Sequence, residues 1–147
     1  MDFESYKARI NALDIQIDSV KKQIQQIENQ IEEAHAAKIS ANKMRNEFDG
    51  FVAKRKLSAD RPVKGRHLKS FRSFLNKAQS ILGGTDYFRA TASIDEMCNL
   101  VNQKIYHYEE NLDYCKNELR RLNKQKELLI EEYNTALLTY ALEGGTP

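Results

Sequence analysis

Histidine, cysteine and paired carboxylate side chains are the groups in this sequence that could carry out chemistry. The three histidines, His35, His67 and His107, lie on separate segments and lack the short spacing of zinc ligands. The glycines at positions 83 and 84 are not followed by the lysine and hydroxyl residue of a phosphate-binding loop. The adjacent carboxylates are typical of a solvated helix surface: Glu32-Glu33, Glu109-Glu110 and Glu131-Glu132. We therefore predict a protein that is not an enzyme and that holds neither a metal nor a cofactor.

The two cysteines, Cys98 and Cys115, are seventeen residues apart on one expected helix. A rise of about 1.5 Å per residue separates them by roughly 25 Å, which is too far for a disulfide. Both also occupy apolar positions of a helical repeat. We expect them to act as small buried hydrophobic residues.

Basic residues are concentrated in the middle of the chain. The formal net charge is only +2, but residues 61–90 hold seven basic side chains and one acidic side chain. Four of them form a basic patch that could contact phosphates, namely Lys64, Arg66, Lys69 and Arg72. Phe71 and Phe74 could then stack on bases, although Phe71 shares a helical stripe with Leu68 and Leu75 and is better explained as a core residue. Nucleic-acid binding is therefore an alternative function, and docking of an acidic protein is another use of the same charges.

Two long segments position these residues. In the first, apolar side chains recur at alternating spacings of three and four: Phe3, Tyr6, Ile10, Leu13, Ile17, Val20, Ile24, Ile27, Ile31 and Ala34. The second segment repeats the pattern: Ile94, Cys98, Val101, Ile105, Tyr108, Leu112, Cys115, Leu119, Leu122, Leu129, Tyr133, Ala136 and Tyr140. A repeat of 3.5 residues keeps one stripe facing a partner helix, so both segments are predicted to be coiled-coil helices.

Lys126 occupies the one charged position of the second stripe. In an antiparallel hairpin it lies near the level of Asp14 to Asp18, where it can form an ion pair. Alternatively, its aliphatic stem packs in the stripe while the ammonium group reaches water.

The first stripe is expected to change phase after Ala34. The new series comprises Ala37, Ala41, Met44, Phe48 and Phe51. Such a shift would rewind the coiled coil locally; in the simpler alternative, the helix meets different neighbours here. Asp49-Gly50 could kink or end the helix, but the apolar spacing favours continuation to about residue 57.

The segment from Ser58 to Gly65 is predicted to break the first helix. Pro62 disfavours helix at the preceding residue, and Gly65 suits a turn. A short helix is expected from about residue 66 to residue 82, ending at the glycine pair. The next helix would begin near residue 86, or at the capping-box pattern that starts at Ser93, and would run to about residue 142 before a short disordered tail.

The predicted fold is therefore all-α. We expect a single domain, 1–147, in the form of an elongated antiparallel helical hairpin (a coiled coil) with a short additional helix at the tip. No segment approaches the roughly 18 apolar residues of a membrane span, and no cleavable signal pattern follows the first methionine. We expect a cytoplasmic protein, with secretion alongside a partner, without a cleaved signal peptide, as the alternative.

The tip sequence Pro62-Val63-Lys64-Gly65, followed by the apolar series Leu68, Phe71 and Phe74, resembles a family pattern. It is similar to the WXG-type helical-hairpin proteins of type VII secretion in Gram-positive bacteria, and closest to the YwqH-like accessory proteins associated with LXG toxins. The layout of long helix, turn, short helix and long helix covers most of the chain. Val63 stands where the family has tryptophan, and Gly65 is retained.

The resemblance implies a non-enzymatic adaptor or targeting chaperone. Its expected partner is the N-terminal helical domain of an LXG-type polymorphic toxin, with a second small helical protein as a further partner. The tip motif would comprise Val63, Gly65, Phe71 and Phe74, and the partner-binding stripe would include Ile17, Ile24, Leu119 and Leu122. The alternatives are a nucleic-acid-binding coiled coil that uses the basic patch and a prefoldin-like holdase. The holdase is disfavoured because the tip lacks strand-forming sequence.

Overall fold

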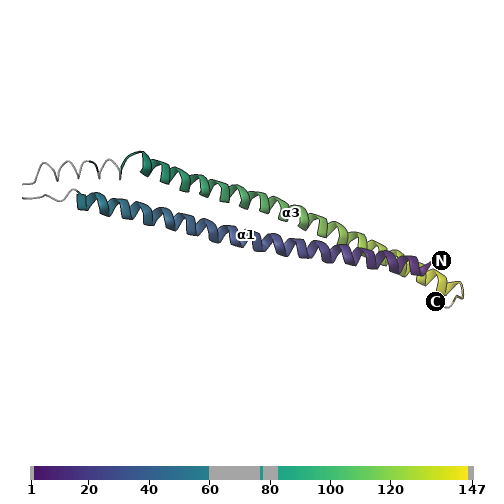
Figure 1. The fold of residues 1–147 in the computed structure, drawn as a ribbon. Helices are drawn as coiled ribbons and strands as arrows, with labels where there is room; N and C mark the ends of the chain where they lie inside the picture. Colours follow the sequence, from purple (N-terminus) through teal and green to yellow (C-terminus); the bar gives the residue numbers. More distant parts are fainter. Residues whose placement is uncertain (1, 60–76, 78–82, 146–147) are drawn as a thin grey trace, which may run out of the picture. The chain divides into compact units, whose positions relative to one another are not determined.

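A computed structural model describes residues 2–59, 77 and 83–145. Two long helices account for nearly all of them, α1 (Phe3–Ala59) and α3 (Thr85–Leu142), and no strand occurs among the described residues. Figure 1 shows α1 in purple to teal and α3 in green to yellow. The expected all-α class and the two long helices that pack against each other are confirmed. The expected turn and short tip helix lie outside the described residues.

Local sequence explains where the helices begin and end. The Asp2 carboxylate accepts a hydrogen bond from the backbone N–H of Ser5 at 3.1 Å and so caps α1. α3 begins after Gly84, whose carbonyl accepts a hydrogen bond from the N–H of Phe88. Helix α3 continues without interruption through Ser93, so the alternative start at that residue is wrong.

The glycines after α3 belong to a helix cap and not to the disordered tail expected from the sequence. Gly144 has φ = +85°, a left-handed conformation that favours glycine, and its N–H donates to the carbonyl of Ala141. The N–H of Gly145 donates to the carbonyl of Tyr140 at 3.0 Å, and the Tyr140 ring occupies the place where a Cβ of residue 145 would lie. These contacts satisfy carbonyls that the last turn of an α-helix leaves without an intrahelical partner.

The chain divides into two compact units. Unit 1 comprises Met1–Ile31 with Tyr106–Pro147, and unit 2 comprises Glu32–Ile105. Within unit 1, Asp14 pairs with Lys126 and Glu28 with Lys116, so α1 and α3 are antiparallel there. Within unit 2, Asn42 contacts Cys98 and Asp49 contacts Tyr87, so α1 and α3 are antiparallel in this unit.

The predicted change of phase in α1 is wrong. The stripe continues past Ala34 at the original spacing, through positions 38, 41, 45, 48 and 52, whereas Met44 and Phe51 are exposed. Two of these inward positions hold Lys38 and Arg45. Both can lie beside the partner helix because their aliphatic stems pack while their charged ends reach the surface, and Arg45 also pairs there with Asp95. Continuation through Gly50 is confirmed.

Candidate helix-binding site

The inward-facing residues of α1 and α3 meet along a line that we call the seam. In unit 1 this seam contains the four residues predicted as the partner-binding stripe. Ile17 and Leu122 are buried, with 4% and 2% of their surfaces exposed, and Ile24 and Leu119 are half-buried. The structure therefore brings all four into the packing of α1 against α3 within this unit. Their role toward another protein stays a prediction.

A polar layer interrupts this apolar seam. The Lys126 ammonium group donates to Asp14 Oδ1 at 2.5 Å, with the Lys126 side chain 30% exposed and that of Asp14 44% exposed. The ion pair predicted for Lys126 is confirmed. A single polar pair at a seam position fixes register more than it adds stability, since partial exposure weakens its attraction.

An open groove runs along one edge of this seam. Its volume is about 390 Å³, and it is lined by Arg9, Ala12, Leu13, Gln16, Gln125, Leu128, Leu129 and Glu132. Leu13 and Leu129 belong to the seam and form an apolar floor, whereas the other six residues each precede or lie beside a seam residue on the same edge. Leu128 stands in the wall with 51% of its surface exposed. The groove thus combines an apolar floor with amide and charged groups on its walls.

A second hollow of about 480 Å³ adjoins the groove. It shares Leu128 and Glu132 with the groove and adds Tyr6, Glu131, Thr135, Ala136 and Thr139. The added residues of α3 extend the open edge beyond Glu132 to Thr139, by about two helical turns. Such an edge has the length and composition that a docked amphipathic helix requires.

Aromatic residues pack together at the end of unit 1 where α1 begins and α3 ends. The Phe3 ring meets Tyr140 edge to face, with 5.4 Å between centroids, and meets Tyr133 in the same way at 6.0 Å. The Tyr6 ring also packs against the Tyr133 ring, with 5.8 Å between the centroids. These rings hold the ends of α1 and α3 together, because edge-to-face pairs add to the burial of their area.

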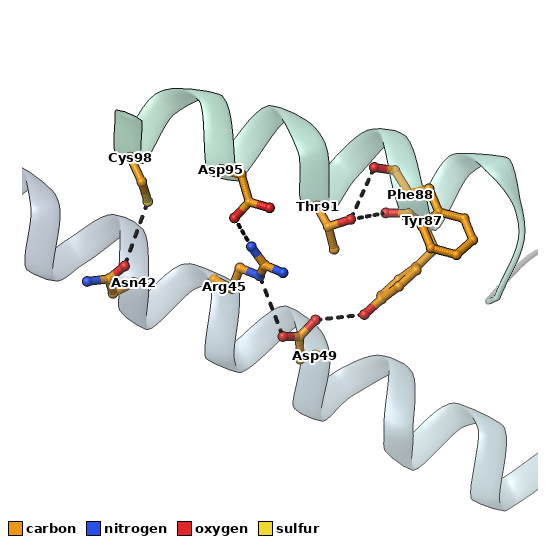
Figure 2. A network of polar contacts seen from close by, with 8 residues as sticks. All are labelled: Asn42, Arg45, Asp49, Tyr87, Phe88, Thr91, Asp95 and Cys98. Carbon is orange, nitrogen blue, oxygen red and sulfur yellow. Dashed lines mark hydrogen bonds and ion pairs between the residues drawn. The ribbon is translucent and has the colours of Figure 1, made fainter. Parts of the chain in front are cut away.

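Unit 2 joins its two helices through a polar network (Figure 2). The Arg45 guanidinium pairs with Asp95 on α3 and lies 3.7 Å from Asp49 on its own helix. The Tyr87 hydroxyl donates to Asp49 at 3.0 Å. The Cys98 thiol lies 3.7 Å from the side-chain oxygen of Asn42. These contacts join one edge of α1 to one edge of α3.

The Phe48 ring and the Thr91 hydroxyl make further contacts with this part of α3. The Tyr87 ring stacks on Phe48, with 5.7 Å between centroids and 14° between planes. The hydroxyl of buried Thr91 lies 3.1 Å from the carbonyl oxygens of both Tyr87 and Phe88 within α3, so its single proton is shared between these two acceptors. The hydrogen bond to Asp49 raises the pKa of Tyr87, because the carboxylate accepts only from the neutral phenol. Tyr87 therefore contributes its polar contact in the protonated form.

Apolar periodicity in the sequence did not indicate this network. The predicted apolar series of α1 passes from Met44 to Phe48 and omits Arg45, because a count of apolar residues skips an arginine. Strict continuation of the three–four spacing from Ala34 would have placed it inward, where Asp95 is its natural counter-charge. The partnership of Asp49 with Tyr87 carries no comparable sequence signal.

The tip motif (Val63, Gly65, Phe71 and Phe74) and the basic patch (Lys64, Arg66, Lys69 and Arg72) lie outside the described residues. Cys98 and Cys115 are free and half-buried. In the described part of the chain, no three His, Cys, Asp or Glu side chains come together in a way that could hold a metal ion. Neither described helix has a stretch apolar enough, over the necessary length, to cross a membrane.

Comparisons with protein-family models, with curated proteins and with solved structures find no match to this chain.

Proposed function

We propose that this protein is a non-enzymatic adaptor, or targeting chaperone, which binds the N-terminal helical domain of an LXG-type polymorphic toxin destined for type VII secretion. The class of partner rests on the tip sequence and the layout described above. The observation that carries the mechanism is the open groove of unit 1, with its apolar floor and its exposed Leu128.

The small number of buried side chains between α1 and α3 supports a role in binding other helices. Among the described residues, no large side chain is more than 98% buried, and the buried apolar core consists of seven side chains. Two helices can cover only one stripe of each other, so both edges of the seam stay open to solvent. A further helix laid along the groove would bury the exposed Leu128 and the rest of the half-buried Leu13, and would complete a small bundle.

Binding of this kind depends on apolar area and on the shape of the groove. Affinity for the toxin domain should therefore change little between about 0.1 M and about 0.5 M salt, since screening acts on exposed charges. Nucleic-acid binding through the basic patch would instead weaken steeply over the same range because it depends on release of counterions. The salt dependence separates the adaptor from its alternative.

The test uses two exposed leucines of α3 in unit 1. Leu128→Asp would place an unpaired carboxylate in the docked groove, and Leu138→Asp is the matched control, since Leu138 is 67% exposed and does not line the groove. Full-length chain is mixed with the N-terminal helical domain of the toxin encoded beside its gene, and the affinity is measured by calorimetry. We expect Leu128→Asp to weaken binding more than about tenfold and Leu138→Asp to leave it unchanged.

Equal effects of the two substitutions would remove the groove from the proposal. Absence of any complex with that toxin domain, together with tight and salt-sensitive binding of DNA or RNA, would replace the adaptor function with the nucleic-acid alternative.

A further inference from the structure

The two edges of the unit 2 seam differ in chemistry. Asn42 and Asp49 each follow an inward residue of α1, and Asp95 follows an inward residue of α3. At about 100° per residue, these three lie on one side of the seam. Figure 2 shows each of them in a polar contact: Asn42 with Cys98, Asp95 with Arg45, and Asp49 with Tyr87. We call this side the polar edge.

Large apolar side chains lie on the opposite edge. Met44 and Phe51 each precede an inward residue of α1, and Met97 precedes inward Cys98 on α3, which places all three about 100° to the other side of the seam. They are 52%, 51% and 39% exposed. The antiparallel register set by Arg45 with Asp95 brings Met44 and Met97 to the same level. We call this side the methionine edge.

The α1 part of the methionine edge is evenly spaced. Ala37, Met44 and Phe51 are separated by seven residues each, so they form a straight row along two heptads of a coiled coil. The apolar series that begins at Ala37 in the sequence therefore has two parts. Ala41 and Phe48 belong to the seam, and the row of Ala37, Met44 and Phe51 runs beside it. In unit 2, Arg45 occupies a seam position while Met44 and Phe51 beside it are exposed. Burial of the row against another protein surface would remove this apolar area from water.

The row is complementary to itself about Met44. If α1 packs antiparallel against α1 of a second copy with a two-fold axis at Met44, Ala37 of each copy lies opposite Phe51 of the other. A small side chain then meets a large one on both sides of the axis. In the same register Glu33 lies opposite Arg55, so unlike charges meet at both ends of the contact.

Arg55 is already held at the end of this row. Its guanidinium group lies 5.1 Å from the centroid of the Phe51 ring. The Met97 side chains of both copies would flank the Met44 pair at the axis, and methionine adapts well to such a contact. Each contact occurs twice, as an isologous two-fold interface requires.

We propose that the methionine edge of unit 2 is a homodimer interface, in which two copies of this chain pack α1 against α1 about a two-fold axis at Met44. The proposal is independent of the adaptor function, because the adaptor's groove lies in unit 1 and the dimer forms without any toxin.

Disulfide trapping tests the position of the axis. In a full-length chain with Cys98 and Cys115 replaced by serine, Met44→Cys places one thiol on the axis in each copy. Mild oxidation should convert most of this variant to a covalent dimer. Ile39→Cys is the matched control, since Ile39 is 69% exposed but lies on another face of α1, and it should stay monomeric on the same gel.

Charge reversal tests the register. Analytical ultracentrifugation of the full-length chain alone should give twice the monomer mass of 17.0 kDa. Glu33→Arg should weaken the dimer at least fivefold, and the double variant Glu33→Arg/Arg55→Glu should restore it, which a structural loss in the single variant would not allow.

A monomer at all concentrations up to about 100 μM would overturn the proposal, since an isologous interface of ordinary size associates below this range. Crosslinking of Ile39→Cys in preference to Met44→Cys would also overturn it. A monomer whose methionine edge is protected only in the complex with the toxin domain would assign that edge to the partner instead, and the adaptor function would stand.

Discussion

Single residues in the unit 1 seam determine how firmly α1 and α3 hold together. Leu122 and Ile17 are the most buried of the four stripe residues predicted from the sequence, whereas Ile24 and Leu119 retain partial exposure. Because few side chains of the seam are buried, each of them contributes a large part of the apolar burial between the two helices. The polar pair of Lys126 and Asp14 contributes mainly to register because both groups are partly exposed.

Leu122→Ala should lower the free energy of unfolding by about 2–4 kcal/mol, because it removes buried methyl groups and leaves a cavity. Leu128→Ala is the control on the same helix and should cost less than about 1 kcal/mol, since half of that side chain is exposed. Urea denaturation followed by circular dichroism measures both. Equal losses would mean that the seam does not run through Leu122.

The pKa of Tyr87 predicts a response to alkaline pH. The raised pKa means that the folded protein favours the protonated phenol, so the contribution of Tyr87 is complete below its ordinary value of 10.0 and is lost as the pH rises through the raised value. Wild type should therefore lose more thermal stability than Tyr87→Phe between pH 8 and about pH 11. Melting curves of both proteins at the two pH values check this, and parallel losses would contradict it.

At the scale of the elements, the sequence predicted helix α1 correctly but misread its inward face after Ala34. Regular spacing of apolar residues sufficed for the first ten seam positions. It failed where Lys38 and Arg45 take inward positions, because a charged residue with a long stem packs like an apolar one. Met44 and Phe51 then supplied a competing apolar series on the neighbouring face. Apolar periodicity alone cannot tell which of two overlapping rows meets the partner helix.

Replacing both Lys38 and Arg45 with leucine tests the face assignment. In the seam, the two leucines would gain apolar burial, and the exposed carboxylates left behind can be solvated. The double variant should therefore be more stable than wild type by about 1–3 kcal/mol. No gain, or greater aggregation with unchanged stability, would indicate that positions 38 and 45 face solvent. Lys43→Leu, a substitution at an exposed position, is the control.

For the molecule as a whole, the sequence sufficed for the all-α class, for the two long antiparallel helices and for the level at which Lys126 meets Asp14. It did not indicate the open groove, since a groove depends on which side chains stand back from the seam on both helices at once. Residues such as Gln16 and Gln125 carry no distinctive spacing and become part of a site only when the register brings them together.

The claim that the unit 1 groove receives a partner helix can be tested most directly by hydrogen–deuterium exchange on the full-length chain with and without the toxin's N-terminal helical domain. Bound helix should slow exchange in peptides that cover residues 6–16 and 125–139, the two walls of the groove, because docking stabilises these turns against local opening. Unchanged exchange in both regions within a complex that has formed would contradict the account.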